Sequence, residues 1–305
     1  MNLEEKKIKR TDIFVNPLNK EWWYTGCFDK NRNLYFSFYF IRTPFLDSFN
    51  FTLFDLKEKK PFVFNKKFFL KKDQEKNQLD LYKKSKGLFI SYLGDENHGW
   101  SFRFEKKGIT VHLKIKPTEP CFTKFDNYFF NQYSMLHFIR NQVNGRISLN
   151  NKIYEISNAL GYYDHCFGKV PRKTAWHWIA VQNEDIALVS LVNYGAYAQK
   201  YTQVLFKTSD HKRSDWVRLN QDVSFEYTSD SKDREWNATS CDMDLKINNL
   251  MVSKSREVIP PITPFFINVQ HDEYFIEASG KIKIDNQWIN TGVMHGVLEE
   301  HFGKW

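Results

Sequence analysis

The sequence predicts an all-β fold, and three observations support this prediction. Aromatic residues make up 17% of the chain, with 28 Phe and 15 Tyr, and both residue types favour the pleated, half-buried surface of a sheet. Short apolar runs recur along the chain between turn residues, which is typical of sandwiches and barrels. A length of 305 residues predicts about two domains at roughly 150 residues each.

The first half of the chain contains a series of predicted strands. Residues 34–41 form a long run rich in Phe and Tyr. Residues 102–104 and 109–115 flank a Lys-Lys-Gly turn, and the second run alternates apolar and polar residues, so the pair predicts a β-hairpin. Similar signals predict a hairpin over 145–156. Helices are expected to be few, with residues 129–141 as the candidate for a short one.

The second half continues the pattern. Residues 176–181 and 186–192 flank a polar turn and predict another hairpin. Short apolar runs then follow to the end of the chain. The stretch 169–173 is basic, contains a proline and precedes a new series of strands, so we place the domain boundary after Gly168. The predicted domains are residues 1–168 and 169–305.

Charge is concentrated in one stretch. The net charge is +8, and residues 57–86 hold eleven lysines against four acids. Such a surface could bind anionic lipid or nucleic acid, but a solvated face with lysine-protected edge strands is the commoner explanation. Arg is scarce there, whereas nucleic-acid modules favour it. We therefore expect no nucleic-acid partner, and only peripheral membrane contact is retained as an alternative.

Several classes of site are disfavoured by missing motifs. The four cysteines are widely spaced, no CxxC or HExxH pattern occurs, and we expect no metal. Neither GxSxG, GxGxxG nor a P-loop is found, so triad hydrolases and nucleotide enzymes are disfavoured. Residues 1–7 lack the apolar core of a signal peptide, and no apolar run approaches the roughly 18 residues of a membrane span. These features predict a cytoplasmic protein with reduced thiols.

The run from Glu21 to Gly26 is the first candidate for chemistry. Side chains alternate along a strand, so Glu21, Trp23 and Thr25 should share one face, while Trp22 occupies the other with the tyrosine that follows Trp23. If the Glu21 face points into a barrel, desolvation would raise the pKa of this acid. The alternative is that Glu21 lies at a rim and the tryptophans form core.

The segment 161–168, Gly-Tyr-Tyr-Asp-His-Cys-Phe-Gly, is the second candidate. In an extended chain Tyr162 and Asp164 share a face, and Tyr163 and His165 take the other. An acid in an apolar pocket can protonate an alkene or a carbonyl, and a phenol can stabilise the developing charge. The alternative is that Asp164 and His165 bind backbone amides at a bend.

Two weaker candidates lie in the second half. Trp176 and Trp178 share a face of a predicted strand, and aromatic cavity walls stabilise carbocations, although core packing is the commoner explanation. The C-terminal run contains Glu299 and Glu300 as further acids. A solvated charge pair on a closing strand is the commoner explanation there.

Together, these motifs resemble a known family. The pattern Glu-Trp-Trp-Tyr-x-Gly at residues 21–26 resembles the N-terminal signature of the AttH and CrtC-like proteins, which include the carotenoid hydratases (hydroxyneurosporene synthase). Gly-Tyr-x-Asp-His-x-x-Gly at residues 161–168 resembles their central signature. The segment 176–178 and the tail also resemble a related double-calycin family. The resemblance implies two consecutive lipocalin-like (calycin) β-barrels that cover nearly the whole chain.

The resemblance also implies roles for individual residues. In the carotenoid hydratases the aspartate of the central signature protonates an isolated double bond, and a nearby tyrosine assists. Those positions correspond to Asp164 and Tyr162. The family also places a tryptophan upstream, facing the cation. Residues 135–139 contain none, and Phe138 or Trp176 would take its place.

We therefore expect a cofactor-free enzyme that acts on an apolar, isoprenoid- or polyketide-like substrate by hydration, cyclisation or isomerisation. Asp164 would be the general acid, Tyr162 its partner, and Glu21 a second acid or a water-positioning group. The residues expected to contact the ligand are Trp22, Trp23, Trp176, Trp178 and His165. The alternative is a lipocalin-like protein that only binds a hydrophobic small molecule.

Overall fold

All regular elements in the described part of the structure, a computed structural model, are β-strands, which confirms the predicted class. The structure describes residues 19–43, 47–68, 79–95, 97–126, 132–169, 173–194, 200–207, 214–219, 222–228, 235–259 and 267–304. No helix in these ranges combines the length and the hydropathy of a membrane span.

The chain divides into two compact units, residues 1–170 and 171–305. The strands of the first unit are β1 (Asn19–Asp29), β2 (Leu34–Arg42), β3 (Asp47–Asp55), β4 (Lys60–Phe68), β5 (Leu79–Ser85), β6 (Leu88–Asp95), β7 (Gly99–Lys106), β8 (Ile109–Lys116), β9 (Glu119–Asp126), β10 (Gln132–Leu149) and β11 (Lys152–Lys169). The strands of the second unit are β12 (Lys173–Gln182), β13 (Ile186–Asn193), β14 (Lys200–Lys207), β15 (Ser214–Arg218), β16 (Ser224–Tyr227), β17 (Glu235–Ser240), β18 (Met243–Ile259), β19 (Ile267–Ile284), β20 (Gln287–Asn290) and β21 (Met294–Lys304).

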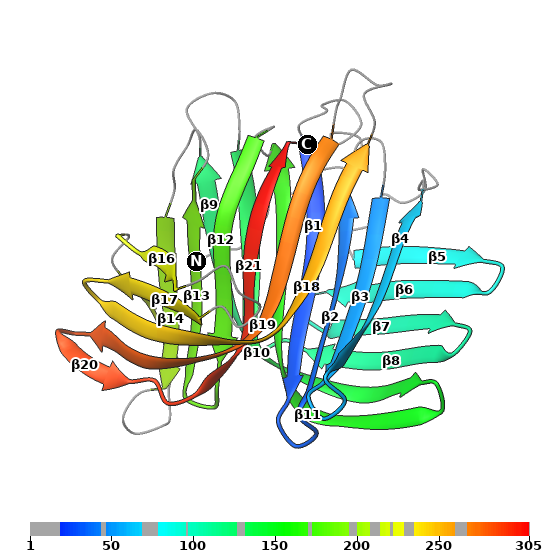
Figure 1. Ribbon diagram of the computed structural model, residues 1–305, viewed down its shortest axis with the longest axis horizontal. Helices are drawn as coiled ribbons and strands as arrows, with labels where there is room; N and C mark the ends of the chain where they lie inside the picture. The colour runs from blue at the N-terminus through cyan, green and yellow to red at the C-terminus, as the bar shows by residue number, and fades with distance from the viewer. Residues whose placement is uncertain are drawn as a thin grey trace. The chain divides into compact units, whose positions relative to one another are not determined.

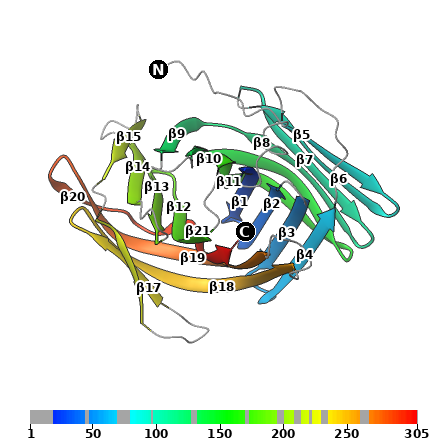
Figure 2. The ribbon, with the colours of Figure 1, turned by 90° about the horizontal axis from the view of Figure 1, so that it is seen from above.

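Each unit is one antiparallel sheet that curls into a half-barrel (Figure 1, Figure 2). The first sheet has the order β4-β3-β2-β1-β11-β10-β8-β7-β6-β5, and β9 pairs with β10. The second has the order β15-β14-β13-β12-β21-β19-β18-β17-β16, and β20 pairs with β19. The first strand of each unit therefore pairs with its last, through β1–β11 and β12–β21.

Local patterning explains the hairpins. Along β8, buried and exposed residues alternate without interruption, as expected for a strand with one face on the core. The turn before it contains Gly108 at φ 84°, in the left-handed region that glycine adopts without strain. The predicted hairpins over 102–115, 145–156 and 176–192 are all confirmed.

The short helix predicted over 129–141 is wrong for the residues described there. Residues 132–141 belong to β10, and 129–131 lie outside the described residues. Residues 135–138 are all buried, and both edges of the strand are paired. A strand buried on both faces has a continuous apolar run, which periodicity alone cannot distinguish from a buried helix.

A bulge divides β10 into two parts. Its first part pairs with β9 and its second with β8. Opposite β11 the pairing steps from Phe138–Tyr163 to Asn141–Gly161. One residue of β10 is therefore extra, and Arg140 in this step has φ 57°. An extra residue exchanges the faces of the strand, so Phe138 and Val143 both point into the core although an even–odd count would separate them.

Aromatic side chains fill the first half-barrel. The rings of Phe38 and Phe102 stack at 3.8 Å, and those of Trp100 and Tyr163 at 4.1 Å. We call the sheet surface that carries these core residues the inner face, and the opposite surface the outer face. Because β4 and β5 are the ends of the sheet order, side chains rather than backbone pairs join them in the described residues. Lys83 Nζ, for example, lies 5.5 Å from the ring centroid of Phe68.

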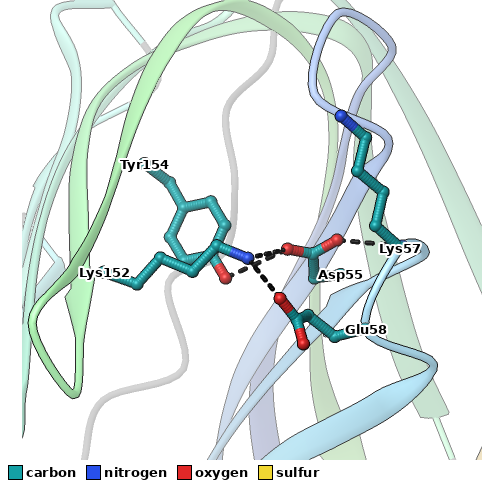
Figure 3. A network of polar contacts seen from close by, with 5 residues as sticks. All are labelled: Asp55, Lys57, Glu58, Lys152 and Tyr154. Carbon is teal, nitrogen blue, oxygen red and sulfur yellow. Dashed lines mark hydrogen bonds and ion pairs between the residues drawn. The ribbon is translucent and has the colours of Figure 1, made fainter.

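Asp55 anchors a polar network at the end of β3 (Figure 3). Its Oδ2 accepts hydrogen bonds from Lys152 Nζ at 2.7 Å and Tyr154 Oη at 3.1 Å, and its Oδ1 accepts one from the Lys57 backbone at 2.9 Å. Lys152 also contacts Glu58 at 2.8 Å. Burial favours a raised pKa for Asp55, but the hydrogen bonds, led by that of Lys152, outweigh it and hold the pKa below its usual value. The network therefore ties the β3–β4 turn to the β10–β11 turn, although β3 and β11 are not neighbours in the sheet.

We expect Asp55→Asn to lower the free energy of unfolding by about 1–3 kcal/mol at pH 7, because a charge-assisted hydrogen-bond network loses its acceptor. A carboxyl with a depressed folded-state pKa contributes stability above its unfolded pKa of about 4 and loses it as the pH falls further. The difference between wild type and variant should therefore narrow at pH 3. Urea unfolding at pH 7 and pH 3 measures both values.

Glu58→Gln is the matched control, because Glu58 contacts the same ammonium group but its side chain is 61% exposed. Exposed ion pairs are worth little, so a change within about 0.5 kcal/mol is expected. Equal losses in the two variants, or a gap for Asp55→Asn that persists at pH 3, would contradict the assignment of Asp55 as the anchor.

Candidate acid–base site

The segment 161–168 lies inside strand β11. The alternative of a bend at Asp164 and His165 is therefore wrong. It pairs with β1 on one side and with β10 on the other. Its backbone groups are therefore engaged in the sheet, and its side chains point alternately to the two faces. The two signature motifs are neighbours in this arrangement: Tyr24 lies opposite Asp164, and Gly26 lies opposite Tyr162.

The alternation of faces is as predicted. Tyr163 belongs to the aromatic core, so it lies on the inner face, and His165 shares that face. Tyr162 and Asp164 lie together on the outer face, where each is 3% exposed. They were expected to face a cavity of the barrel. They lie instead on the side of the sheet opposite the barrel core, because the core takes the residues on either side of them.

Asp164 has one oxygen held and one oxygen without a hydrogen bond. Tyr162 Oη donates to Asp164 Oδ2 at 2.9 Å. Asp164 Oδ1 is buried and makes no hydrogen bond with any residue that the structure describes. Burial raises the pKa of Asp164 to about 7, while the hydrogen bond from Tyr162 acts in the opposite direction. The carboxyl can therefore exist as a neutral acid near physiological pH, when its proton is available on Oδ1.

His137 completes the site, and sequence analysis assigned it no role. It is the cross-strand partner of Asp164 on β10, is fully buried, and places Nδ1 2.8 Å from Tyr162 Oη. Burial lowers the pKa of His137 to about 3, so the imidazole is neutral. A phenol has one hydrogen, and Tyr162 donates it to Asp164, so Nδ1 must carry the hydrogen of the second bond. In the sequence, His137 stands out only as a histidine inside an apolar run, and the pattern does not indicate which face of the sheet it occupies.

Glu21 is separated from this site. It lies on the inner side of β1, where Glu21 Oε1 is 3.0 Å from His165 Nε2 and Glu21 Oε2 is 3.5 Å from Arg42 Nη1. Trp23 stacks on His165 with ring centroids 5.0 Å apart, and the Arg42 guanidinium lies 5.4 Å from the Trp23 ring. The three predicted catalytic residues therefore occupy opposite faces of one sheet, with Asp164 and Tyr162 together and Glu21 apart.

A pocket adjoins the Glu21 group. It has an empty volume of about 290 Å³, open solvent included, and Trp23, Phe40 and Arg42 line it from the central strands. Phe68 of β4 and Lys83 of β5 line it from the two ends of the sheet order. The pocket therefore lies on the inner face, where the half-barrel is joined by side chains.

The other predicted ligand contacts are dispersed. Trp22 occupies the outer face of β1, opposite in orientation to Trp23. Trp176 and Trp178 share a face of β12 in the second unit, as predicted, and Trp176 stacks on His301 at 3.6 Å. Phe138, which was expected to replace the upstream tryptophan, packs on Trp100 at 5.3 Å on the inner face. It therefore lies on the opposite side of the sheet from Asp164.

Most of the described lysines in the lysine-rich stretch are exposed. Within residues 57–86, described lysines such as Lys66, Lys67 and Lys84 are exposed, while 69–78 lie outside the described residues. Membrane contact through this surface stays a prediction. Among the described residues, no group of three or more His, Cys, Asp or Glu side chains is placed to hold a metal ion.

The chain thus forms two half-barrels, and a buried acid lies on the last strand of the first one. No protein-family model and no curated protein sequence matches the chain. Solved structures do match. A protein described as an AttH of Nitrosomonas europaea superposes with a TM-score of 0.65 at 13% identity, over 100% of this chain and 97% of that one. Kievitone hydratase from Nectria haematococca superposes with a TM-score of 0.63 at 12% identity, over 98% and 96%. These likenesses confirm the predicted AttH-like double-barrel fold.

Asp164→Asn should stabilise the protein at high pH. A carboxyl whose folded-state pKa is raised binds its proton more tightly in the folded state, so stability falls as the pH rises from about 4 to about 7. At about 1.4 kcal/mol for each pKa unit, the wild type loses roughly 4 kcal/mol over that range. The amide variant lacks this loss, so chemical denaturation should show it to be the more stable protein at pH 8.

Asp244→Asn provides the control, because Asp244 is also on a strand but its side chain is 60% exposed. It should show no gain in stability between pH 4 and pH 8. A wild-type stability that does not decline over this range, or a decline that Asp164→Asn shares, would show that Asp164 is not a neutral buried acid.

Proposed function

We propose that the chain is a hydratase-like acid catalyst that needs no cofactor, and that Asp164 is its general acid. The observation that carries the proposal is a buried carboxyl with a pKa of about 7 whose Oδ1 makes no hydrogen bond with the described residues. A general acid works best when its pKa lies near the working pH. The fold shared with kievitone hydratase supports hydration over other acid-initiated reactions.

The reaction would begin with transfer of the Asp164 Oδ1 proton to one carbon of a carbon–carbon double bond, which leaves a carbocation at the other carbon. A water molecule then bonds to the cation through oxygen. The resulting oxonium returns a proton to the Asp164 carboxylate, which restores the acid. The net change is addition of one water to the alkene, so protons and electrons balance without an external oxidant or reductant.

Tyr162 and His137 would support the ionised state of Asp164. The Tyr162 hydroxyl donates to Oδ2, and a hydrogen bond to a carboxylate favours the charged form. His137 Nδ1 donates in turn to Tyr162 Oη at 2.8 Å, which orients the phenol hydrogen toward Asp164. Tyr162 and His137 would thus stabilise the carboxylate that appears after the proton has left.

The substrate would be an apolar molecule of the isoprenoid or polyketide type that carries an isolated double bond. Protonation of such a bond is also the first step of cyclisation and isomerisation, and the fate of the cation then depends on whether water or a second double bond reaches it. Glu21 is on the other face of the sheet from Asp164, so the proposal assigns the whole proton cycle to Asp164.

The second candidate is a binding protein without catalysis. It is favoured by the inner-face pocket lined by Trp23, Phe40 and Phe68, because apolar pockets with a few polar groups are typical ligand sites. The two candidates differ in the fate of the ligand. A bound molecule recovered unchanged after incubation supports binding, and one recovered with an added water supports the hydratase.

The hydratase proposal predicts incorporation of solvent oxygen. The full chain is incubated with a panel of prenylated and linear isoprenoid alkenes in oxygen-18 water, and products are analysed by mass spectrometry. We expect a labelled alcohol from at least one substrate, and Asp164→Asn should lower the rate by about 10²–10⁴, the usual contribution of a general acid. Unchanged turnover in this variant would remove Asp164 from the mechanism.

Tyr162→Phe should move the pH profile. The Tyr162 hydrogen bond lowers the pKa of Asp164, so its loss raises that pKa. The fall of kcat/KM on the alkaline side should shift upward by about one pH unit, the equivalent of one hydrogen bond of about 1.4 kcal/mol. Tyr163→Phe is the control, since Tyr163 is adjacent in sequence but points to the inner face. Equal shifts in both variants, or no shift in Tyr162→Phe, would contradict the role of Tyr162.

A further inference from the structure

A second group of hydrogen-bonded titratable residues lies in the C-terminal unit, and the proposed hydratase mechanism does not use it. Glu300 of β21 lies opposite His177 of β12, with Glu300 Oε1 3.3 Å from His177 Nε2. Tyr274 Oη of β19 donates to Glu300 Oε2 at 3.3 Å. His177 Nδ1 is 2.8 Å from Oη of Tyr194, the residue directly after β13. A carboxylate, an imidazole and a phenol therefore form a continuous series across three elements.

The hydrogens of this series can be assigned. A carboxylate only accepts, so His177 Nε2 must donate to Glu300. With a single hydrogen on the imidazole, held on Nε2, Nδ1 is an acceptor, and Tyr194 donates its one hydrogen to it. Burial, together with the negative charge of Glu300, raises the pKa of Tyr194 to about 12, so the phenol keeps its hydrogen. The Tyr194 oxygen thus offers only lone pairs, and it makes no other hydrogen bond with the described residues.

Aromatic rings surround the series. The His177 ring lies 5.1 Å from Trp236 and 5.7 Å from Phe225, both of which belong to the inner core of the second half-barrel. Tyr227 contacts Trp236 at 5.0 Å, and Phe302 contacts His177 at 6.4 Å. These surroundings suit an apolar or aromatic molecule rather than a hydrated ion.

Solvent reaches this end of the second half-barrel. Tyr194, Tyr227 and Phe302 are 47%, 46% and 44% exposed, although each contacts a ring of the inner group. Exposed aromatic side chains gathered around one buried group are characteristic of binding sites. The backbone N–H of Tyr194 donates to Ala175 O at 2.7 Å, which fixes the backbone of Tyr194 beside β12.

The first half-barrel also has a carboxylate–imidazole pair between its first and last strands, with the two residue types on exchanged strands. Across the paired first and last strands of that unit, His165 Nε2 contacts Glu21 Oε1 at 3.0 Å. There the third group is the guanidinium of Arg42, 3.5 Å from Glu21. In the second unit the third group is the neutral phenol of Tyr194. The second site therefore presents an uncharged acceptor, which favours a neutral ligand.

We propose that the inner face of the C-terminal half-barrel holds a second ligand site, in which the series Glu300–His177–Tyr194 binds the hydroxyl group of a small apolar alcohol or phenol. The ligand hydroxyl donates to the Tyr194 oxygen. Its apolar part contacts Trp236, Tyr227 and Phe302. The site is independent of Asp164 and needs no chemical step.

The test uses p-cresol as the probe and toluene, which lacks the hydroxyl, as its matched analogue. The full chain, labelled with nitrogen-15 histidine, is titrated with each compound, and the imidazole signals are followed by NMR. The His177 signals are assigned by their loss in His177→Gln. We expect p-cresol to bind more tightly than toluene and to shift the His177 signals.

Tyr194→Phe should weaken p-cresol binding about 3- to 10-fold, the value of one net hydrogen bond, and leave toluene binding unchanged. Glu300→Gln, which preserves shape but releases the His177 tautomer, should also weaken p-cresol binding. Tyr82→Phe is the control, because Tyr82 is a half-exposed tyrosine of the other pocket. The proposal would be overturned if p-cresol did not bind, if p-cresol and toluene bound equally well, or if only the His165 signals shifted. It would also be overturned if Tyr82→Phe weakened p-cresol binding and Tyr194→Phe did not.

Discussion

The first unit depends on the pairing of β1 with β11. This contact joins the two ends of the unit's sequence, so the rest of the sheet must form as an intervening loop, with the entropic cost that long-range pairing carries. The pairing places the two signature motifs side by side, and it does so tightly. A Cβ atom at Gly26 would lie 2.9 Å from Tyr24 Oη. The glycine of the first motif therefore leaves room for a phenol ring beside Tyr162 of the second motif.

Burial of Asp164 lowers the stability of the fold, and it is the feature on which the proposed acid chemistry depends. A buried carboxyl stays protonated near pH 7 because burial raises the free energy of its ionised form. The same free-energy cost lowers the stability of the fold once the pH is high enough to ionise it. The aromatic core on the other side of the same sheet provides the compensating stability. Stacked pairs such as Phe38–Phe102 and Trp100–Tyr163 are close enough to contribute beyond their buried area. The aromatic core and the buried acid thus lie on different faces of the central strands.

The sequence predicted the class of fold and the faces of individual strands, because both follow from local pattern. Period-two alternation correctly placed Tyr162 with Asp164 and Trp176 with Trp178. It could not relate residues on different strands, since that requires the register of pairing. Glu21 and Asp164 were therefore grouped although they lie on opposite faces, and His137 was overlooked although it lies opposite Asp164. The series through His177 was missed for the same reason, since Glu300 reaches His177 from another strand and Tyr194 reaches it from the residue after β13.

The bulge in β10 switches which residues of the strand face the core. Before Ile139 and Arg140 the even-numbered residues face the core, with Phe138 in the core and His137 on the outer face. After the bulge the odd-numbered residues face the core, as Val143 does. Loss of one residue from the bulge would make the alternation continuous along β10. The side chains before the bulge would then change faces, and the His137 imidazole would move into the aromatic core. A substitution upstream of the bulge alters one side chain, whereas a change in the length of the bulge alters the face of every residue before it.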